Sequence, residues 1–263
     1  MLRQAIKANR QPAQVASAGS TVSIIGIDEQ TISSVAALVR GGFRVICADA
    51  DPTKVDALAD VLRSGTAGLA LWQAHLVEKT LCLTDDPFMA VMDSSITLIC
   101  QGAGESFTGE VDTYALSAMG RMIGSALAHK DEYHVIIQQA SVEPGTTRGA
   151  LVSAIEAASG LQAGAGFGAC HLSSRFTHLA SGDGAPLFAG VTDLVTASMV
   201  ENLLHRAGRH ATTTLIEISE MKGWVACDVD RFSSNLPLSK ASHDRLDARE
   251  LLAALQDTFS LTA

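Results

Sequence analysis

The segment from Val22 to Asp49 constrains the fold of this chain more than any other part of the sequence. A short apolar run at residues 22–26 ends in a glycine, and an apolar repeat with helical spacing follows over residues 32–39. A second apolar run, residues 43–49, ends in an acidic residue. This order is typical of the first strand, turn, helix and second strand of a dinucleotide-binding fold.

The turn in this segment departs from the dinucleotide-binding fingerprint. Where Gly-x-Gly-x-x-Gly is expected, the chain has Gly26, Asp28 and Thr31. Gly26 keeps the tight turn, but Asp28 places a carboxylate at the positive end of the following helix, where a pyrophosphate would bind. We expect Asp28 to cap its own helix, which is worth about 1 kcal/mol, and to occupy the anion site. We favour this interpretation over a working dinucleotide site, and we expect Thr31 to push helix and strand slightly apart.

Asp49 stands at the end of the second strand, where a carboxylate would hold a ribose diol. The alternative is a polar residue that merely ends a strand, and Asp51 close by makes this equally acceptable. If a nicotinamide cofactor binds, Asp49 favours NAD over NADP.

Strands and helices alternate along the chain as far as residue 172, which predicts an α/β fold with a doubly wound, Rossmann-like parallel sheet. We expect residues 1–21 to form a mobile N-terminal extension and residues 22–215 to form the Rossmann-like domain. Residues 216–263 are expected to add a short helical appendage, with an amphipathic helix at residues 245–259. The strands are expected at 22–26, 44–49, 81–84, 96–100, 133–138, 167–172, 187–190 and 212–216, and the other helices at 32–40, 52–62, 69–78, 88–92, 111–129, 148–158, 195–207 and 217–229.

Composition excludes several functional classes. The formal net charge of −9 argues against binding to nucleic acid or to an anionic membrane surface. No apolar run is long enough for membrane insertion, and residues 1–20 lack the apolar core of a signal peptide. The five cysteines are scattered and have no CxxC spacing, so we expect reduced thiols and a cytoplasmic protein.

Two further groups of residues are candidates for a site. Ser141, Pro144, Gly145 and Thr146 follow one expected strand and Gly102 follows another, and the carboxyl ends of strands line the ligand crevice of open sheets. For the turn at 144–146 we favour a structural role, with Thr146 as the cap of the next helix.

The second group is a small basic cluster near the end of the helix expected at 195–207. His205, Arg206, Arg209 and His210 are explained as solvated cations favoured by the helix dipole. We expect no metal site there, because neither carboxylates nor cysteines stand at ligand spacing.

Several motifs resemble the nucleotide-sugar dehydrogenases that oxidise UDP-glucose or GDP-mannose to uronic acids, with the GDP-mannose branch closest. The matching segments appear in the family's order and spacing over residues 22–232. They are Asp-Ser-Ser-Ile-Thr-Leu-Ile-Cys-Gln-Gly at 93–102, Val-Ile-Ile at 135–137, Ser-Val-Glu-Pro-Gly-Thr at 141–146, the glycine-rich stretch at 159–168, and Glu-Ile-Ser-Glu-Met at 217–221. The resemblance implies a Rossmann domain that once held NAD.

The chain departs from this family where the family does its chemistry. A ligand-contacting Thr and the following Pro fall on Ala103 and Gly104, while the family's Asn-Pro-Glu falls on residues 172–174, Leu-Ser-Ser. The family's central-helix Lys falls near Lys222 or Gly223, and its Asn falls near Cys227. No cysteine matches the family's Gly-Gly-x-Cys segment, and we expect the family's C-terminal nucleotide-sugar domain to be absent. Ser141 in place of the family's Thr keeps a hydroxyl.

These departures favour a catalytically degenerate relative that binds, regulates or scaffolds, in bacterial exopolysaccharide biosynthesis by inference from the family. We then expect no cofactor, no catalytic residue and no metal. The alternative is an active NAD-dependent oxidoreductase of nucleotide sugars, and a third possibility is a nucleotide that lacks a pyrophosphate at Asp28. The expected partners are a nucleotide or nucleotide sugar, a protein of polysaccharide synthesis, and a second copy of the chain, since the family dimerises through its central helix.

Overall fold

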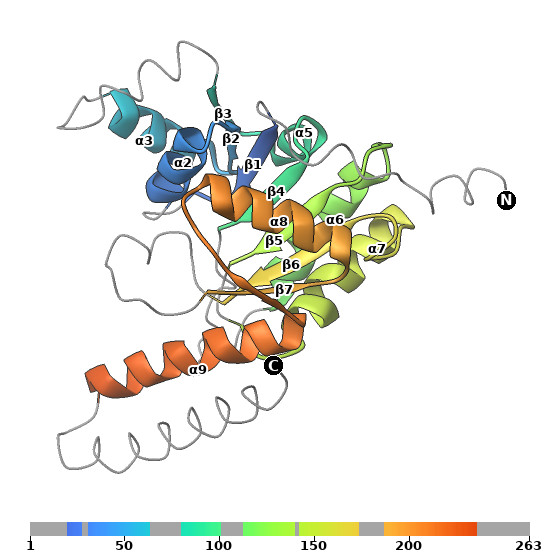
Figure 1. The fold of residues 1–263 in the computed structure, drawn as a ribbon. Helices are drawn as coiled ribbons and strands as arrows, with labels where there is room; N and C mark the ends of the chain where they lie inside the picture. The colour runs from blue at the N-terminus through green and yellow to red at the C-terminus, as the bar shows by residue number, and fades with distance from the viewer. Residues whose placement is uncertain are drawn as a thin grey trace, which may run out of the picture.

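A computed structural model describes residues 20–27, 31–63, 80–100, 113–139, 142–173 and 187–235 of the chain. These residues form one eight-stranded sheet with helices on both faces (Figure 1). The strand order is β3-β2-β1-β4-β5-β6-β7-β8. The first six strands therefore have the order 3-2-1-4-5-6 of dinucleotide-binding folds.

The strands lie where the sequence pattern places them, with ends that differ by one or two residues. They are β1 Thr21–Ile25, β2 Arg44–Ala48, β3 Leu81–Thr84, β4 Ile96–Ile99, β5 Val135–Gln138, β6 Gly168–Leu172, β7 Phe188–Val191 and β8 Thr212–Thr214. Strands β1 to β6 pair in parallel, which confirms the predicted parallel sheet. Strand β7 then runs antiparallel to β6, and β8 runs parallel to β7.

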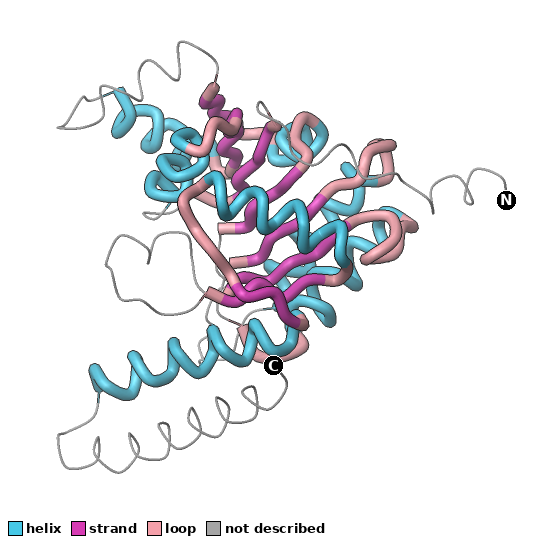
Figure 2. The backbone as a smooth tube through the Cα atoms, in the orientation of Figure 1, coloured by secondary structure: helices cyan, strands magenta, loops and turns pink. Residues whose placement is uncertain are grey.

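Helices cover the two faces of the sheet in separate layers (Figures 1 and 2). One layer holds α2 Thr31–Arg40, α3 Pro52–Arg63 and α8 Leu194–Arg206, and the other holds α5 Pro87–Met92, α6 Thr113–Leu127, the π-helical turn η1 Thr147–Val152 and α7 Ser153–Ser159. The last helix, α9 Ile216–Asn235, starts against the end of the sheet and extends beyond it (Figure 1). The helices expected at 69–78 and 245–259, and the N-terminal extension, lie outside the described residues.

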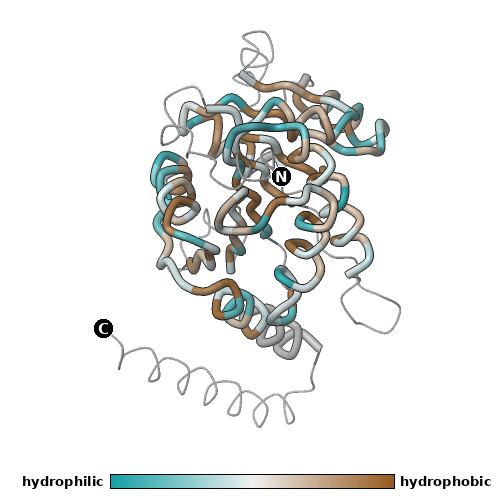
Figure 3. Tube along the Cα trace, turned by 90° about the vertical axis from the view of Figure 1, so that its right-hand side faces the viewer, coloured by the Kyte–Doolittle hydropathy of each residue, from teal (hydrophilic) through white to brown (hydrophobic). Residues whose placement is uncertain are grey.

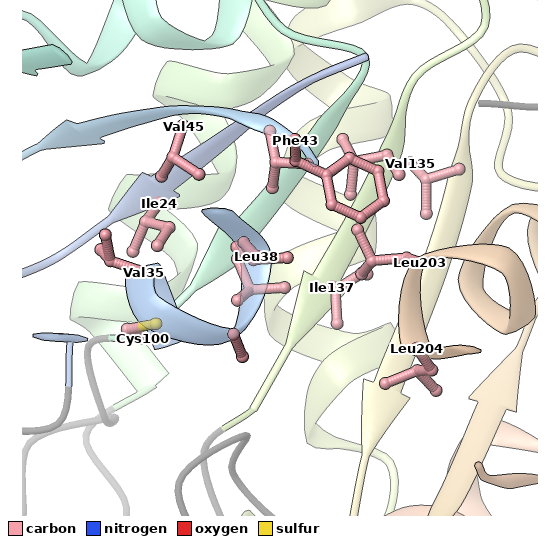
Figure 4. Close-up of a cluster of buried hydrophobic side chains, with 14 of the residues drawn as sticks. Ile24, Val35, Leu38, Phe43, Val45, Cys100, Val135, Ile137, Leu203 and Leu204 are labelled. Atoms are coloured by element: carbon pink, nitrogen blue, oxygen red, sulfur yellow. The ribbon is translucent and has the colours of Figure 1, made fainter. Parts of the chain in front are cut away.

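The strands are apolar on both faces because helices cover both, as is usual for parallel sheets. On one face, Ile24, Val45 and Ile137 meet Leu38 of α2 and Leu203 of α8 (Figure 4). On the other, Ile25, Ile99 and Ile136 meet the apolar sides of α6 and α7. In Figure 3 the outer helices alternate between hydrophilic and hydrophobic stretches, as expected for helices with one buried face.

Two glycines let α6 lie directly against the segment that follows the Pro-Gly-Thr turn. A Cβ on Gly120 would lie 2.8 Å from the carbonyl oxygen of Leu151, and a Cβ on Gly124 would lie 2.7 Å from that of Ile155. Both distances are shorter than real Cβ contacts, so a larger residue would separate the two helices. This close crossing fixes the position of η1 and α7 behind the sheet.

Helix α8 begins at a capping network built around Asp193. The carboxylate accepts hydrogen bonds from the backbone N–H groups of Val195 and Thr196, each at 2.9 Å, and from the hydroxyl of Tyr133 at 2.8 Å. The hydroxyls of Thr192 and Thr196 also donate to it. Burial works against ionisation of Asp193, but these hydrogen bonds outweigh it and hold the pKa of the carboxyl below its usual value.

The lowered pKa predicts a pH-dependent contribution of Asp193 to stability. A carboxyl whose pKa is lower in the folded state stabilises the fold above its unfolded pKa, and the contribution is lost as pH falls through the folded pKa. Asp193→Asn keeps a capping oxygen but removes the charge, so it should lower the free energy of unfolding by about 1 kcal/mol at pH 7. Urea denaturation at pH 7, 5 and 3 should show this difference shrinking toward acid. The exposed Asp56→Asn serves as control, and an equal pH profile for both variants would contradict the prediction.

Candidate ligand site at the carboxyl edge of the sheet

The chain leaves β1 in opposite directions, toward β2 on one side and β4 on the other, which makes the β1–β4 border the topological switch point. Ligands of open α/β sheets bind in the crevice at the carboxyl ends of strands near this point. Gly26, Asp49 and Cys100 each follow one of the three central strands and lie at this edge. The predicted site residues on these strand ends therefore share one region.

Gly26 makes the turn that the sequence predicted. Its φ is +90°, a backbone conformation that favours glycine, and its N–H donates to the carbonyl of Ala48 at 3.0 Å. The first residue of α2, Thr31, is fully buried, and its hydroxyl donates to the carbonyl of Gly26 at 3.4 Å. Asp28, Gly102 and Ser141 lie outside the described residues, so capping by Asp28 and ligand contact by the other two stay predictions.

Asp49 is buried at the end of β2, and its carboxylate is bound from three directions. Oδ2 accepts from the backbone N–H of Ile27 at 2.8 Å and from the ammonium of Lys54 at 3.3 Å, while Oδ1 accepts from the N–H of Asp51 at 3.0 Å. Asp49 thus ties the turn after β1 to the turn after β2. The sequence did not predict the contact with Lys54. This residue stands in the first turn of α3.

Asp51 caps α3. Its Oδ1 accepts from the N–H of Thr53 at 3.0 Å and from the Thr53 hydroxyl at 2.6 Å. The hydrogen bond from the Thr53 side chain, supported by that from its backbone, lowers the pKa of the Asp51 carboxyl.

The Pro144-Gly145-Thr146 turn is present, but the prediction that Thr146 caps the next helix was wrong. Gly145 has a φ of +92°, and the N–H of Thr146 closes the turn onto the carbonyl of Glu143 at 3.0 Å. The side chain of Thr146 makes no capping hydrogen bond. A carboxylate from α9 takes the capping role instead.

Glu220 of α9 caps this helix from a distance of more than 70 residues in the chain. Its Oε2 accepts from the N–H of Gly145 and its Oε1 from the N–H of Thr147, both at 2.6 Å, and the residue is completely buried. The N-terminus of a helix carries a partial positive charge and unpaired N–H groups, which a carboxylate satisfies. A buried carboxylate therefore occupies the anion-binding position at the N-terminus of this helix.

The rest of the first two turns of α9 is bound to β6 and β7. The hydroxyl of Ser219 lies 3.0 Å from Nδ1 of the buried His171, and its single proton lies within reach of the backbone carbonyls of His171 at 2.9 Å and Phe188 at 3.0 Å. One turn further, Gly223 lies so close to the segment after β6 that a Cβ would be 2.8 Å from the carbonyl oxygen of Ser173. The neighbouring Lys222 holds its ammonium 5.2 Å from the centre of the Phe188 ring.

The basic cluster differs from the prediction at Arg206. Its guanidinium is not merely solvated: it donates to the carbonyl oxygens of Gly41 at 2.9 Å and Gly42 at 3.1 Å, and it lies 3.8 Å over the ring of Phe43. Arg206 thereby caps the end of α2 from the end of α8. His205 and His210 contact each other, with ring centroids 5.5 Å apart.

Across the described part of the chain, no helix is long and apolar enough to cross a membrane.

Cys47, Cys82, Cys100 and Cys170 are free thiols, and burial raises the pKa of Cys47 and Cys170. Neither of these two thiols is therefore a good nucleophile.

Comparison with known proteins decides the family. Residues 20–171, more than half of the chain, match the NAD binding domain of the UDP-glucose/GDP-mannose dehydrogenase family. The chain belongs to the UDP-glucose/GDP-mannose dehydrogenase family. It is 27% identical over 208 residues to the GDP-mannose 6-dehydrogenase of Pseudomonas aeruginosa, an alignment that covers 76% of this chain and 47% of the relative.

Solved structures of the dehydrogenase family have the same fold. A ternary complex of GDP-mannose dehydrogenase from Pseudomonas aeruginosa aligns with a TM-score of 0.67 at 26% identity, over 81% of this chain and 50% of the other. A UDP-glucose dehydrogenase from Pyrobaculum islandicum aligns with a TM-score of 0.69 at 20% identity, over 84% of this chain and 52% of the other. The chain thus spans about half the length of these relatives.

In this family domain, Glu220 should be a major source of stability. Glu220→Gln removes a buried charge that accepts two hydrogen bonds and brings an N–H₂ group against an N–H donor. We expect the free energy of unfolding to fall by about 3 kcal/mol, measured by urea denaturation. The matched control is Glu217→Gln on the same helix, whose carboxylate is 41% exposed and pairs with Arg148 at 2.5 Å. That variant should lose less than about 1 kcal/mol, and equal losses would show that Glu220 has no special role.

Proposed function

We propose that this family domain has no dehydrogenase activity of its own and works as a binding, regulatory or scaffolding protein beside the enzymes of bacterial exopolysaccharide synthesis. The observation that carries the proposal is the close contact between Gly223 of α9 and Ser173 after β6. Both positions belong to segments where the resemblance places residues of the dehydrogenase reaction.

The contact leaves no room for a catalytic lysine at position 223. Any side chain there would meet the carbonyl oxygen of Ser173, with 2.8 Å left for the Cβ alone. The other candidate, Lys222, directs its ammonium to the ring of Phe188. The family's glutamate falls on a serine in the same segment, residue 174. The sequence therefore lacks the family's residue at two positions, 174 and 223, which supports loss of the reaction rather than exchange of one residue.

The residues at the ribose end fit NAD only in part. Asp49 stands in the right place, at the end of β2, and a carboxylate has about four acceptor positions. Three of them are taken by Ile27, Asp51 and Lys54. A ribose diol needs two positions, so it must displace Lys54, whose side chain is 42% exposed. This competition supports weak binding of a dinucleotide.

A second candidate function is that of an NAD-dependent oxidoreductase acting on a nucleotide sugar. One observation favours it: the buried Asp49 lies next to the turn at Gly26, the arrangement that holds NAD in this fold. Bound NAD would supply hydride transfer. Asp49 would contribute the ribose contact, and Gly26 would contribute the tight turn after β1.

Calorimetric titration of the full chain with NAD and NADH distinguishes the two candidate functions. The proposed function predicts no binding tighter than about 1 mM, and a flat absorbance of reduced nicotinamide in the presence of GDP-mannose or UDP-glucose. Micromolar binding of NAD that disappears in Asp49→Asn would overturn the weak-binding expectation, and steady turnover would establish the oxidoreductase. A thermal-shift screen of nucleotides and nucleotide sugars then searches for the bound ligand, since binding to the folded state raises its stability.

A further inference from the structure

Two histidines meet at the turn that joins α8 to β8. His205 stands in the last turn of α8 and His210 in the loop that leads to β8, and both are exposed. Their ring centroids are 5.5 Å apart, with planes tilted by 53°. Within the described part of the chain, neither imidazole is hydrogen-bonded to another group.

The separation of the rings suits a shared metal ion. A Zn–N bond of about 2.0–2.1 Å puts the ion about 3.2 Å from the centroid of a coordinating imidazole. Two such rings around a tetrahedral ion have centroids about 5.2 Å apart. The observed 5.5 Å is within a small side-chain adjustment of this value, when one nitrogen of each ring faces the ion.

The charges around the pair are mixed. Glu201 lies one helical turn before His205 on the same exposed face of α8, and its Oε1 accepts from the Thr213 hydroxyl of β8 at 2.8 Å. Of the two arginines close in sequence, Arg206 directs its guanidinium to the backbone carbonyls of Gly41 and Gly42 at the end of α2. The described residues hold no group of three His, Cys, Asp or Glu side chains placed around one ion. Water must therefore fill the remaining positions.

The sequence alone led us to expect no metal site at this cluster, but the ring contact changes that expectation. We propose that His205 and His210 form a two-histidine site for a divalent transition metal ion of the zinc, nickel or copper class, which imidazole ligands prefer. The ion would bridge the end of α8 and the loop before β8, and so close the turn at residues 207–211. This turn adjoins Arg206, which holds α2, and leads through β8 into α9, which carries Glu220. Metal binding thereby stiffens the connection between the helical layer and the carboxyl edge.

Titration of the full chain with Zn²⁺ by calorimetry, in a buffer without chelators, tests the site. We expect one ion bound with a Kd in the micromolar range, and a weakening of about tenfold or more in His205→Gln and in His210→Gln, because each removes one of two protein ligands. The control is His129→Gln, an exposed histidine whose Nδ1 is bound to the carbonyl of Ser125 at 2.8 Å, which should bind Zn²⁺ like the parent chain.

A second measurement guards against binding at thiols elsewhere. Zn²⁺ should raise the Tm of the parent chain and Mg²⁺ should not, because Mg²⁺ prefers oxygen ligands. The zinc-induced rise in Tm should be absent in the His205→Gln/His210→Gln double variant. In the parent chain, a chelator should abolish it. Zinc binding that persists unchanged in the double variant, or no binding tighter than about 1 mM in the parent chain, would overturn the proposal.

Discussion

Parallel pairing of the six strands β1 to β6 is the constraint on which the rest of this structure depends. It makes every strand end at the same edge, and it needs helices on both faces to bury apolar side chains on both. The turns after β1, β2 and β5 are consequently neighbours of the crevice. Polar residues in those turns are held at one place in space although they lie far apart in the chain.

At that edge, two carboxylates hold the turns in place. Asp49 accepts N–H groups from the turns after β1 and β2, and Glu220 accepts N–H groups from the turn after β5. Each carboxylate satisfies donors that would otherwise lack partners in a buried environment, and a lost charged hydrogen bond of this kind costs about 1.5–3 kcal/mol. The positions of these turns are thus set by hydrogen bonds to two internal carboxylates.

The architecture was predictable from the sequence because its signals are local. The apolar run and glycine at 22–26 and the apolar run at 133–138 each depend on a few neighbouring residues. Even β7 and β8 stand where short apolar or β-branched runs suggested. What the pattern could not give was the direction of β7, since a strand has the same period whichever way it runs.

The site was less predictable because its contacts join distant segments. Thr146 is a reasonable local cap, and only the tertiary fold brings Glu220 to the same N–H groups, 75 residues later for Gly145. Arg206 looked like a solvated cation at its own helix end, and the fold sets it against the end of a helix 165 residues earlier. The sequence around Gly223 did not indicate why a glycine stands there. The explanation is the close approach of the Ser173 backbone, which only the tertiary structure shows.

These contacts also bear on which ligands the crevice can accept. A ligand anion gains from a helix N-terminus only if the N–H groups there are free, and at η1 both oxygens of Glu220 already take them. An incoming phosphate would have to displace a buried carboxylate and leave that charge without partners, which is far more costly than displacing the exposed Lys54 from Asp49. We therefore propose that a nucleotide ligand would be selected at the β1–β2 side, where the partly exposed Lys54 can give way, and not at the β5 side, where Glu220 already takes the N–H groups.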